Sequence, residues 1–227
     1  MEFLLDNNET ERIFQQLLQQ IRVHKNGVVA DVMKQQGIDY KMNWGVSITD
    51  LRAMAGNYAS DHLLALKLWN KQWRESMILA TLLDNPADVT EKQMDFWTRS
   101  FENSEIAEQA SANLWVKTPF AFIKALEWCR GKRHLSRYTG IHLTGRLALT
   151  MKSALDEMFE PFFEELAVLG RDPRLYTVIY RAVIALGNRS EALRAASLSL
   201  AEALATGEQE RAVVLGRALL EEINAWE

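Results

Sequence analysis

Residues 43–82, NWGVSITDLRAMAGNYASDHLLALKLWNKQWRESMILATL, decide the fold, because they predict three consecutive helices. Ser47-Ile48-Thr49-Asp50 is a capping-box pattern, in which the serine hydroxyl accepts a hydrogen bond from a free backbone N–H at a helix start. Apolar residues then recur at helical spacing in three successive groups. No strand pattern separates these groups, so the stretch indicates packed helical hairpins.

Helix signals continue along the rest of the chain. Residues 90–93, TEKQ, repeat the capping-box pattern, and Gly37 is placed to end a short helix in a left-handed cap. Pro119 and Pro173 stand where a first helical turn tolerates a missing N–H. Further helices are expected at 9–23, 28–33, 105–116, 119–129, 135–151, 155–169, 173–186, 190–205 and 208–225. The sequence therefore predicts an all-α fold.

Three of these helices share an arginine near the start and an apolar body that contains alanine or glycine. They are centred on Met77, Ile141 and Val183. Small residues let helices pack closely on both sides, as the inner helices of stacked pairs must. Any buried helix of a bundle can look the same, so this pattern alone leaves a bundle and a solenoid open.

Length and composition restrict the class of protein. The chain has 227 residues, of which 48% are hydrophobic, enough for one sizeable core and for one domain or at most two. No long Gly-, Pro- or Ser-rich linker divides it, so a single domain is expected. Charged residues interrupt every apolar stretch well short of the roughly 18 needed to span a bilayer, and the start, MEFLLDNNETER, is unlike a signal peptide. The single cysteine, Cys129, excludes an internal disulfide. We expect a soluble, cytoplasmic protein with no membrane partner.

Charge is unevenly distributed along the chain. The net charge is −4, unlike that of a protein that coats DNA. Residues 117–152 nevertheless hold eight Lys and Arg residues against one acid, Glu127, while residues 84–108 and 202–227 are rich in acids. The basic segment therefore predicts a phosphate-binding face.

The stretch 43–82 also resembles the DNA alkylation repair family, in its alkylpurine DNA glycosylase (AlkD-like) branch. The resemblance rests on Gly45-Val46, Leu51-Arg52, Leu68-Trp69 and Arg74-Glu75, in that order and spacing, and covers about residues 43–194. It implies a superhelical stack of antiparallel helix pairs, a HEAT-like or ARM-type α-solenoid. Residues 1–42 would then form an N-terminal capping hairpin, residues 43–194 the repeat core, and residues 195–227 C-terminal helices.

The resemblance also implies an activity, the excision of cationic N3- or N7-alkylpurines by N-glycosidic cleavage. Family members use a carboxylate between tryptophans to stabilise the oxocarbenium-like sugar. Here Ser104 replaces the first tryptophan and Glu108 replaces the catalytic aspartate, with Glu105 as the alternative carboxylate. The favoured interpretation of both acids is a helix start, where the dipole favours negative charge. A 3-methyladenine or 7-alkylguanine N-glycosylase is therefore expected to be weak.

Further expectations concern the residues that would bind duplex DNA. Arg137 matches the arginine of the family helix that touches the DNA backbone, and Lys132 and Arg133 precede it closely. Arg181 or Val183 stands where the second tryptophan is expected, and Trp115 is a possible substitute for it. The expected nucleic-acid-binding residues are Arg137, Arg133, Lys132 and Arg181. The alternative interpretation is that the basic residues 132–137 belong to a solvated loop between helices and bind no phosphate.

No cofactor or metal site is expected. His24, His62, His134 and His142 show no metal-ligand spacing with one another or with Cys129. The remaining interpretations are a monomeric repair enzyme, a catalytically silent HEAT-like nucleic-acid-binding protein, and a protein-interaction scaffold with a protein partner.

Overall fold

The computed structural model describes residues 7–226, and the regular elements in that range are all helices. The chain divides into two compact units, Met1–Thr118 and Pro119–Glu227. The boundary falls inside the segment 43–194 that the sequence assigns to one repeat core. A single domain stays a prediction.

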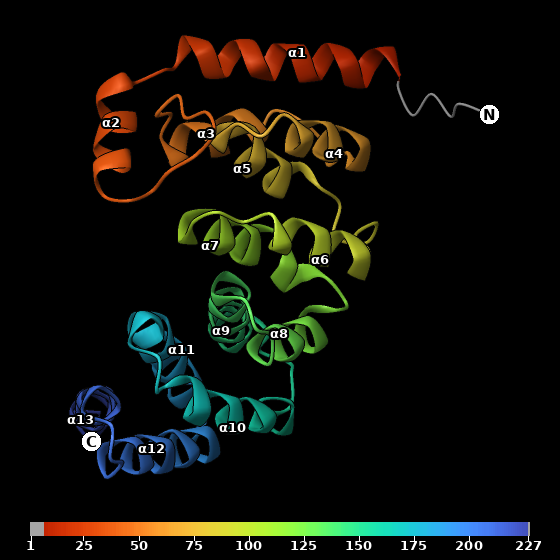
Figure 1. The fold of residues 1–227 in the computed structure, drawn as a ribbon. Coiled ribbons are helices and arrows are strands. Elements are labelled where there is room, and N and C mark those ends of the chain that lie inside the picture. The colour runs from red at the N-terminus through yellow and green to blue at the C-terminus, as the bar shows by residue number, and fades with distance from the viewer. Residues whose placement is uncertain (1–6, 227) are drawn as a thin grey trace. The chain divides into compact units, whose positions relative to one another are not determined.

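In the first unit, the apolar helix α5 occupies the centre, in contact with α3, α4 and α7, while α1 packs on α4 (Figure 1). Every residue of α5 except Leu82 is buried. The helices of this unit are α1 (Asn8–Val23), α2 (Gly27–Gln35), α3 (Ile48–Ala55), α4 (His62–Asn70), α5 (Arg74–Leu83), α6 (Glu91–Arg99) and α7 (Ser104–Asn113), followed by the 3₁₀ turn η1 (Trp115–Lys117).

Both predicted N-caps are present. The Ser47 hydroxyl accepts from the backbone N–H of Asp50 at 3.1 Å, and the Thr90 hydroxyl accepts from that of Gln93 at 3.2 Å. The return bonds of a capping box do not form: the Asp50 carboxylate accepts from the Ser47 hydroxyl, and the Gln93 amide donates to Asp84. The caps therefore set the helix starts without the reciprocal bond.

An aromatic cluster fills the core between α4 and α6. Trp69 and Trp97 stack with ring centroids 3.9 Å apart and planes within 2°. Phe101 and Trp115 pack against this pair, with centroids 6.0 Å from Trp69 and 5.6 Å from Trp97 respectively. These rings are buried, so Trp69 and Trp97 serve as packing residues.

In the second unit, helices α9, α11 and α13 form one layer, and α8, α10 and α12 form the other (Figure 1). Hairpin neighbours α8 and α9, and α12 and α13, pack against each other. The elements are α8 (Ala121–Cys129), α9 (His134–Thr150), η2 (Asp156–Met158), α10 (Glu160–Leu169), η3 (Pro173–Leu175), α11 (Tyr176–Gly187), α12 (Glu191–Ala205) and α13 (Glu210–Asn224).

Glycines allow α9 to approach its neighbours closely on two sides. A Cβ on Gly140 would lie 2.6 Å from the Ala125 carbonyl oxygen of α8 and 2.9 Å from the Cys129 sulfur. A Cβ on Gly145 would lie 3.2 Å from Cα of Ala182 in α11. The predicted use of small residues for close packing on both sides is therefore confirmed for this helix.

Three expected helices are shorter than predicted because each includes a 3₁₀ turn. The range 105–116 divides into α7 and η1, 155–169 into η2 and α10, and 173–186 into η3 and α11. Pro161 and Pro173 lie in the first turns of α10 and η3, where their missing N–H groups cost no hydrogen bond. Pro119, by contrast, lies before the start of α8.

Candidate nucleic-acid interface

The turn between α8 and α9 carries the basic residues expected to bind phosphate. Lys132 and Arg133 are exposed on it. Arg137, one turn into α9, is half-buried and donates from Nε to the carbonyl oxygen of Gly131 at 2.6 Å. Arg137 therefore holds the turn in place, while Lys132 and Arg133 lie at the surface beside it.

Charged groups of both signs surround His134 at this end of α9. Burial lowers the pKa of His134, and the positive charge of Arg174 lowers it further. Asp172 opposes this shift, and Arg137 adds to it. Arg174 belongs to η3, just before α11, and its guanidinium pairs with the Asp172 carboxylate at 2.7 Å, so the two residues together add no net charge to this region.

A stripe of residues runs along the exposed side of α9. Successive members are three or four residues apart, which places them on one helix face: Leu135, Tyr138, His142, Arg146 and Leu149. All are half-buried except Leu149, which is exposed. The Tyr138 and His142 rings lie within 7° of parallel, with centroids 6.5 Å apart. The helix therefore presents aromatic, cationic and apolar groups in one line.

A cavity of about 260 Å³ lies between this stripe and α11. His142, Arg146 and Leu149 line it from α9, and Arg181 lines it from α11. Its other lining residues are small or apolar: Gly145, Val178, Ala182 and Ala185. The Nε atom of Arg146 is buried and has no hydrogen-bond partner among the described residues. The cavity thus combines two guanidinium groups with an apolar surface.

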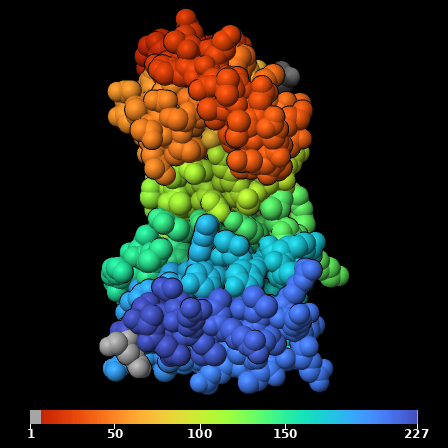
Figure 2. Space-filling view, turned by 90° about the vertical axis from the view of Figure 1, so that its left-hand side faces the viewer, coloured from red at the N-terminus to blue at the C-terminus, as the bar shows by residue number. Residues whose placement is uncertain are grey.

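Within their layer, α9 and α11 lack acidic residues, whereas α13 carries Glu210, Glu221 and Glu222. In the other layer, α10 contains Glu160, Glu164 and Glu165. Glu165 pairs with Arg130 at 2.6 Å. The cations of α9 and α11 are therefore bordered by acids on α13, where Glu222 accepts a hydrogen bond from the Tyr180 hydroxyl of α11. Figure 2 views the unit from the side on which α11 and α13 lie in Figure 1.

The two candidate carboxylates on α7 have different environments. Glu105 accepts two hydrogen bonds from the Arg74 guanidinium, at 2.6 and 2.8 Å, and one from the Tyr40 hydroxyl at 2.7 Å. Burial and the nearby Glu105 raise the pKa of Tyr40, so its hydroxyl stays protonated and donating. Glu108, one turn further along α7, is half-buried. The contacts of Glu105 with Arg74 and Tyr40 give it a structural role.

A buried carboxylate that the sequence patterns did not reveal lies beside this ion pair. Glu75 has no exposed surface and accepts from the backbone N–H groups of Trp44 and Val46. Between them, Gly45 adopts φ 71°, and a Cβ there would lie 2.0 Å from the Asn26 carbonyl oxygen. The Gly45-Val46 and Arg74-Glu75 motifs therefore fix the segment before α3 to the start of α5, through the hydrogen bonds that Glu75 accepts.

The three residues considered for the second aromatic position have different environments. Trp115 has no exposed surface and belongs to the aromatic core of the first unit. On α11, Val183 is fully buried, whereas Arg181 is exposed and lines the cavity. The residues that sequence reasoning missed are Tyr138, His142 and Arg146, whose signal was their common helix face.

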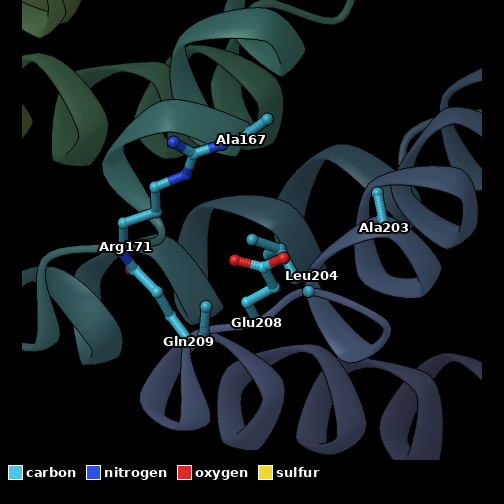
Figure 3. Close-up of a pocket in the computed structure, with 8 residues that line it drawn as sticks. Ala167, Arg171, Ala203, Leu204, Glu208 and Gln209 are labelled. Atoms are coloured by element: carbon cyan, nitrogen blue, oxygen red, sulfur yellow. The ribbon is translucent and has the colours of Figure 1, made fainter.

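A second cavity of about 310 Å³ lies between the ends of α10 and α12 and the start of α13. Arg171 and Glu208 both line it; in Figure 3 the Glu208 carboxylate lies beside Leu204 and the Arg171 guanidinium extends towards Ala167. Because its charges are of opposite sign, this cavity offers no consistent field to a polyanion.

Membrane spans and metal clusters are both absent from residues 7–226. No helix there is long and apolar enough to cross a membrane. In the same range, no three His, Cys, Asp or Glu side chains gather closely enough to hold a metal ion.

Comparison with known proteins supports the fold. No protein-family model matches the sequence, and no curated protein matches it significantly. A solved structure from "a new family of proteins related to the HEAT-like repeat DNA glycosylases with affinity for branched DNA structures" matches with a TM-score of 0.76 over 94% of each chain, at 13% identity. The expected all-α stack of antiparallel, HEAT-like helix pairs is thus confirmed.

Proposed function

We propose that this protein binds duplex DNA through the α9–α11 layer of its second unit. The observation that carries the proposal is that α9 and α11 carry cations and no acids, together with the exposed basic turn at the start of α9. Exposed Lys132 and Arg133, with Arg181 on α11, provide the contacts to phosphate. Arg137 supports them by holding the turn through Gly131.

Phosphate contacts of this kind position a protein on DNA without reading its sequence. Each neutralised phosphate releases counterions, so the affinity must fall steeply with salt concentration. The chain as a whole carries a net charge of −4, which opposes binding outside the basic face. We therefore expect weak, salt-sensitive binding that depends on a few residues.

The fold relationship supports DNA as the partner. The matching structure belongs to a family with affinity for branched DNA and a relationship to HEAT-like repeat DNA glycosylases. We further propose that the protein belongs to the DNA alkylation repair family. In this more specific proposal, Glu108 is the carboxylate that excises cationic alkylpurines. A catalytically silent DNA-binding protein accounts equally for the contacts of Glu105 with Arg74 and Tyr40.

Fluorescence anisotropy with a labelled duplex and a labelled four-way junction tests the proposal. Arg133→Gln combined with Arg181→Gln should weaken binding to both, and should reduce the slope of log affinity against log salt by about 0.9 for each phosphate that the variant no longer neutralises. Arg130→Gln is the matched control, because Arg130 pairs with Glu165 of the other layer.

Equal affinities and equal salt slopes for the wild type and the double variant would remove the α9–α11 layer as the interface. Binding of neither DNA by the wild type would favour the protein-interaction scaffold instead.

A further inference from the structure

We propose that the cavity between α9 and α11 takes up one unpaired nucleotide of DNA, an inference that rests on the proposed DNA binding. A flat cationic surface would suffice for duplex phosphates, so the cavity calls for a separate explanation. Its volume of about 260 Å³ is slightly below the roughly 300–1,000 Å³ of sites for drug-sized ligands. That size suits a single base rather than several.

The lining of the cavity matches the two parts of a nucleotide. Leu149, Val178 and Ala185 provide an apolar surface that offers nothing to a phosphate but can pack against a flat base. Arg146 and Arg181 provide guanidinium groups that can bind a phosphate or stack on a base face. None of the eight lining residues is acidic, so no charge in the lining repels the anion.

Arg146 gives a specific reason to expect a ligand. Its Nε atom is buried without a hydrogen-bond partner among the described residues, although a buried donor normally has one. Leaving such a group unpaired costs roughly 1–3 kcal/mol. Because this atom is buried, a phosphate or a base acceptor in the cavity supplies the missing partner when the half-buried Arg146 side chain turns towards it.

The occupant has to be unpaired. A base inside a duplex is covered on both faces by its neighbours, and its edge is paired, so it cannot enter a cavity between two helices. An unstacked base exposes its faces, which single-strand-binding proteins contact through aromatic and arginine side chains. The nearly parallel rings of Tyr138 and His142 continue the stripe beside the cavity, and His142 itself lines it.

Duplexes with and without a one-nucleotide bulge of 2-aminopurine test the inference. Anisotropy should show about tenfold tighter binding of the bulged duplex, a gain typical of stacking one base on a protein. The 2-aminopurine fluorescence should change on binding, because the base leaves its neighbours in the bulge.

Two variants link that preference to the cavity. Ala185→Leu fills it, and Leu149→Glu places a negative charge at its rim, where Leu149 is 48% exposed. Each should lower the preference for the bulge to less than about twofold, since it removes the stacking gain. Ala185→Leu should leave binding of the paired duplex nearly unchanged. Ile123→Glu on α8, at a position 58% exposed, is the matched control for the added charge.

The outcomes separate this inference from the proposed function. Equal binding of both duplexes by the wild type, or a preference that survives Leu149→Glu, would overturn the nucleotide site and leave DNA binding intact. Absence of binding to either duplex would overturn both. If circular dichroism shows that Ala185→Leu misfolds, the exposed Leu149→Glu variant decides.

Discussion

Arg74 and Glu105 form a two-point ion pair that joins the start of α5 to the start of α7. The guanidinium Nη2 and Nε atoms lie 2.6 and 2.8 Å from the two carboxylate oxygens. The Arg74 side chain is 4% exposed and that of Glu105 is 17% exposed. Burial acts to lower the pKa of Arg74, but the pairing with Glu105, together with Glu75 and Tyr40, outweighs burial, so the pKa is raised. This geometry identifies Glu105 as a partner of Arg74.

The first prediction is that Glu105→Gln destabilises the protein without a specific effect on chemistry. Removing one partner from a buried pair leaves the other charge uncompensated, which costs about 3 kcal/mol. Glu75, whose carboxylate lies 3.2 Å from Arg74 Nη1, limits the loss. Urea denaturation followed by circular dichroism measures the change in the free energy of unfolding.

Glu108→Gln is the control, because it makes the same change one turn later on the same helix. We expect a loss below about 1 kcal/mol, since Glu108 is only half-buried. Equal losses for the two variants would show that the contact with Arg74 contributes little to stability.

A second prediction concerns the close contact of α8 and α9. In Gly140→Ala, the added Cβ would lie 2.6 Å from a backbone oxygen and 2.8 Å from the Cys129 nitrogen. Backbone cannot move aside cheaply, so we expect about 1–3 kcal/mol of destabilisation despite the better helix propensity of alanine. Gly27→Ala, which would meet nothing within 4 Å, is the control. A melting temperature for Gly140→Ala at or above the wild type would contradict the packing described for α9.

The third prediction follows from the burial of Cys129. Burial raises the pKa of its thiol to about 12, whereas an unfolded thiol ionises near about 8.5. A raised pKa in the folded state means that stability is present below about pH 8.5 and is lost as the pH rises towards 12. By about pH 10 the loss from this group should reach about 2 kcal/mol.

Urea midpoints at about pH 7.5 and about pH 10, on either side of the unfolded thiol's pKa, measure this loss. Cys129→Ala provides the reference for all other groups that titrate in the interval. The wild type should lose more stability than Cys129→Ala over that range. The same loss in both would mean that the thiol ionises as readily in the folded protein as in the unfolded one.

Local patterns predicted the helices because the physics of a helix start is local. The caps at Ser47 and Thr90 and the left-handed turn at Gly37 are read from a few adjacent residues, and all three are present. The 3₁₀ turns were missed, since such turns commonly adjoin the ends of α-helices and continue the same helical pattern.

The candidate site depends on contacts between residues that are far apart in the sequence, and such contacts produce no periodic pattern in it. Arg74 and Glu105 are 31 residues apart, so the role of Glu105 could not be inferred from its helix. The cavity depends on the rotation of α9 against α11, which brings Arg146 and Arg181 to opposite sides of one space. The basic segment was visible in the sequence, but which of its residues face solvent was not.

The fourth prediction tests excision of alkylated bases. A carboxylate that stabilises an oxocarbenium-like sugar needs close positioning and little water. Ser104 is half-buried at the first position of α7 and provides no aromatic wall for Glu108. We therefore expect slow release of cationic N3- or N7-alkylpurines from methylated duplex DNA and no release of neutral lesions, measured by chromatography of the freed bases.

Glu108→Gln should lower that release by about a hundredfold, because it removes the charge that stabilises the transition state. Glu105→Gln should lower it only as far as it unfolds the protein, so activity at a temperature where both variants are folded separates the two acids. Ser104→Trp combined with Glu108→Asp should raise the rate, since it restores an aromatic wall beside a shorter carboxylate. Release that is unaffected by Glu108→Gln would place the catalytic group elsewhere. No release from any variant, together with intact DNA binding, would identify a catalytically silent DNA-binding protein.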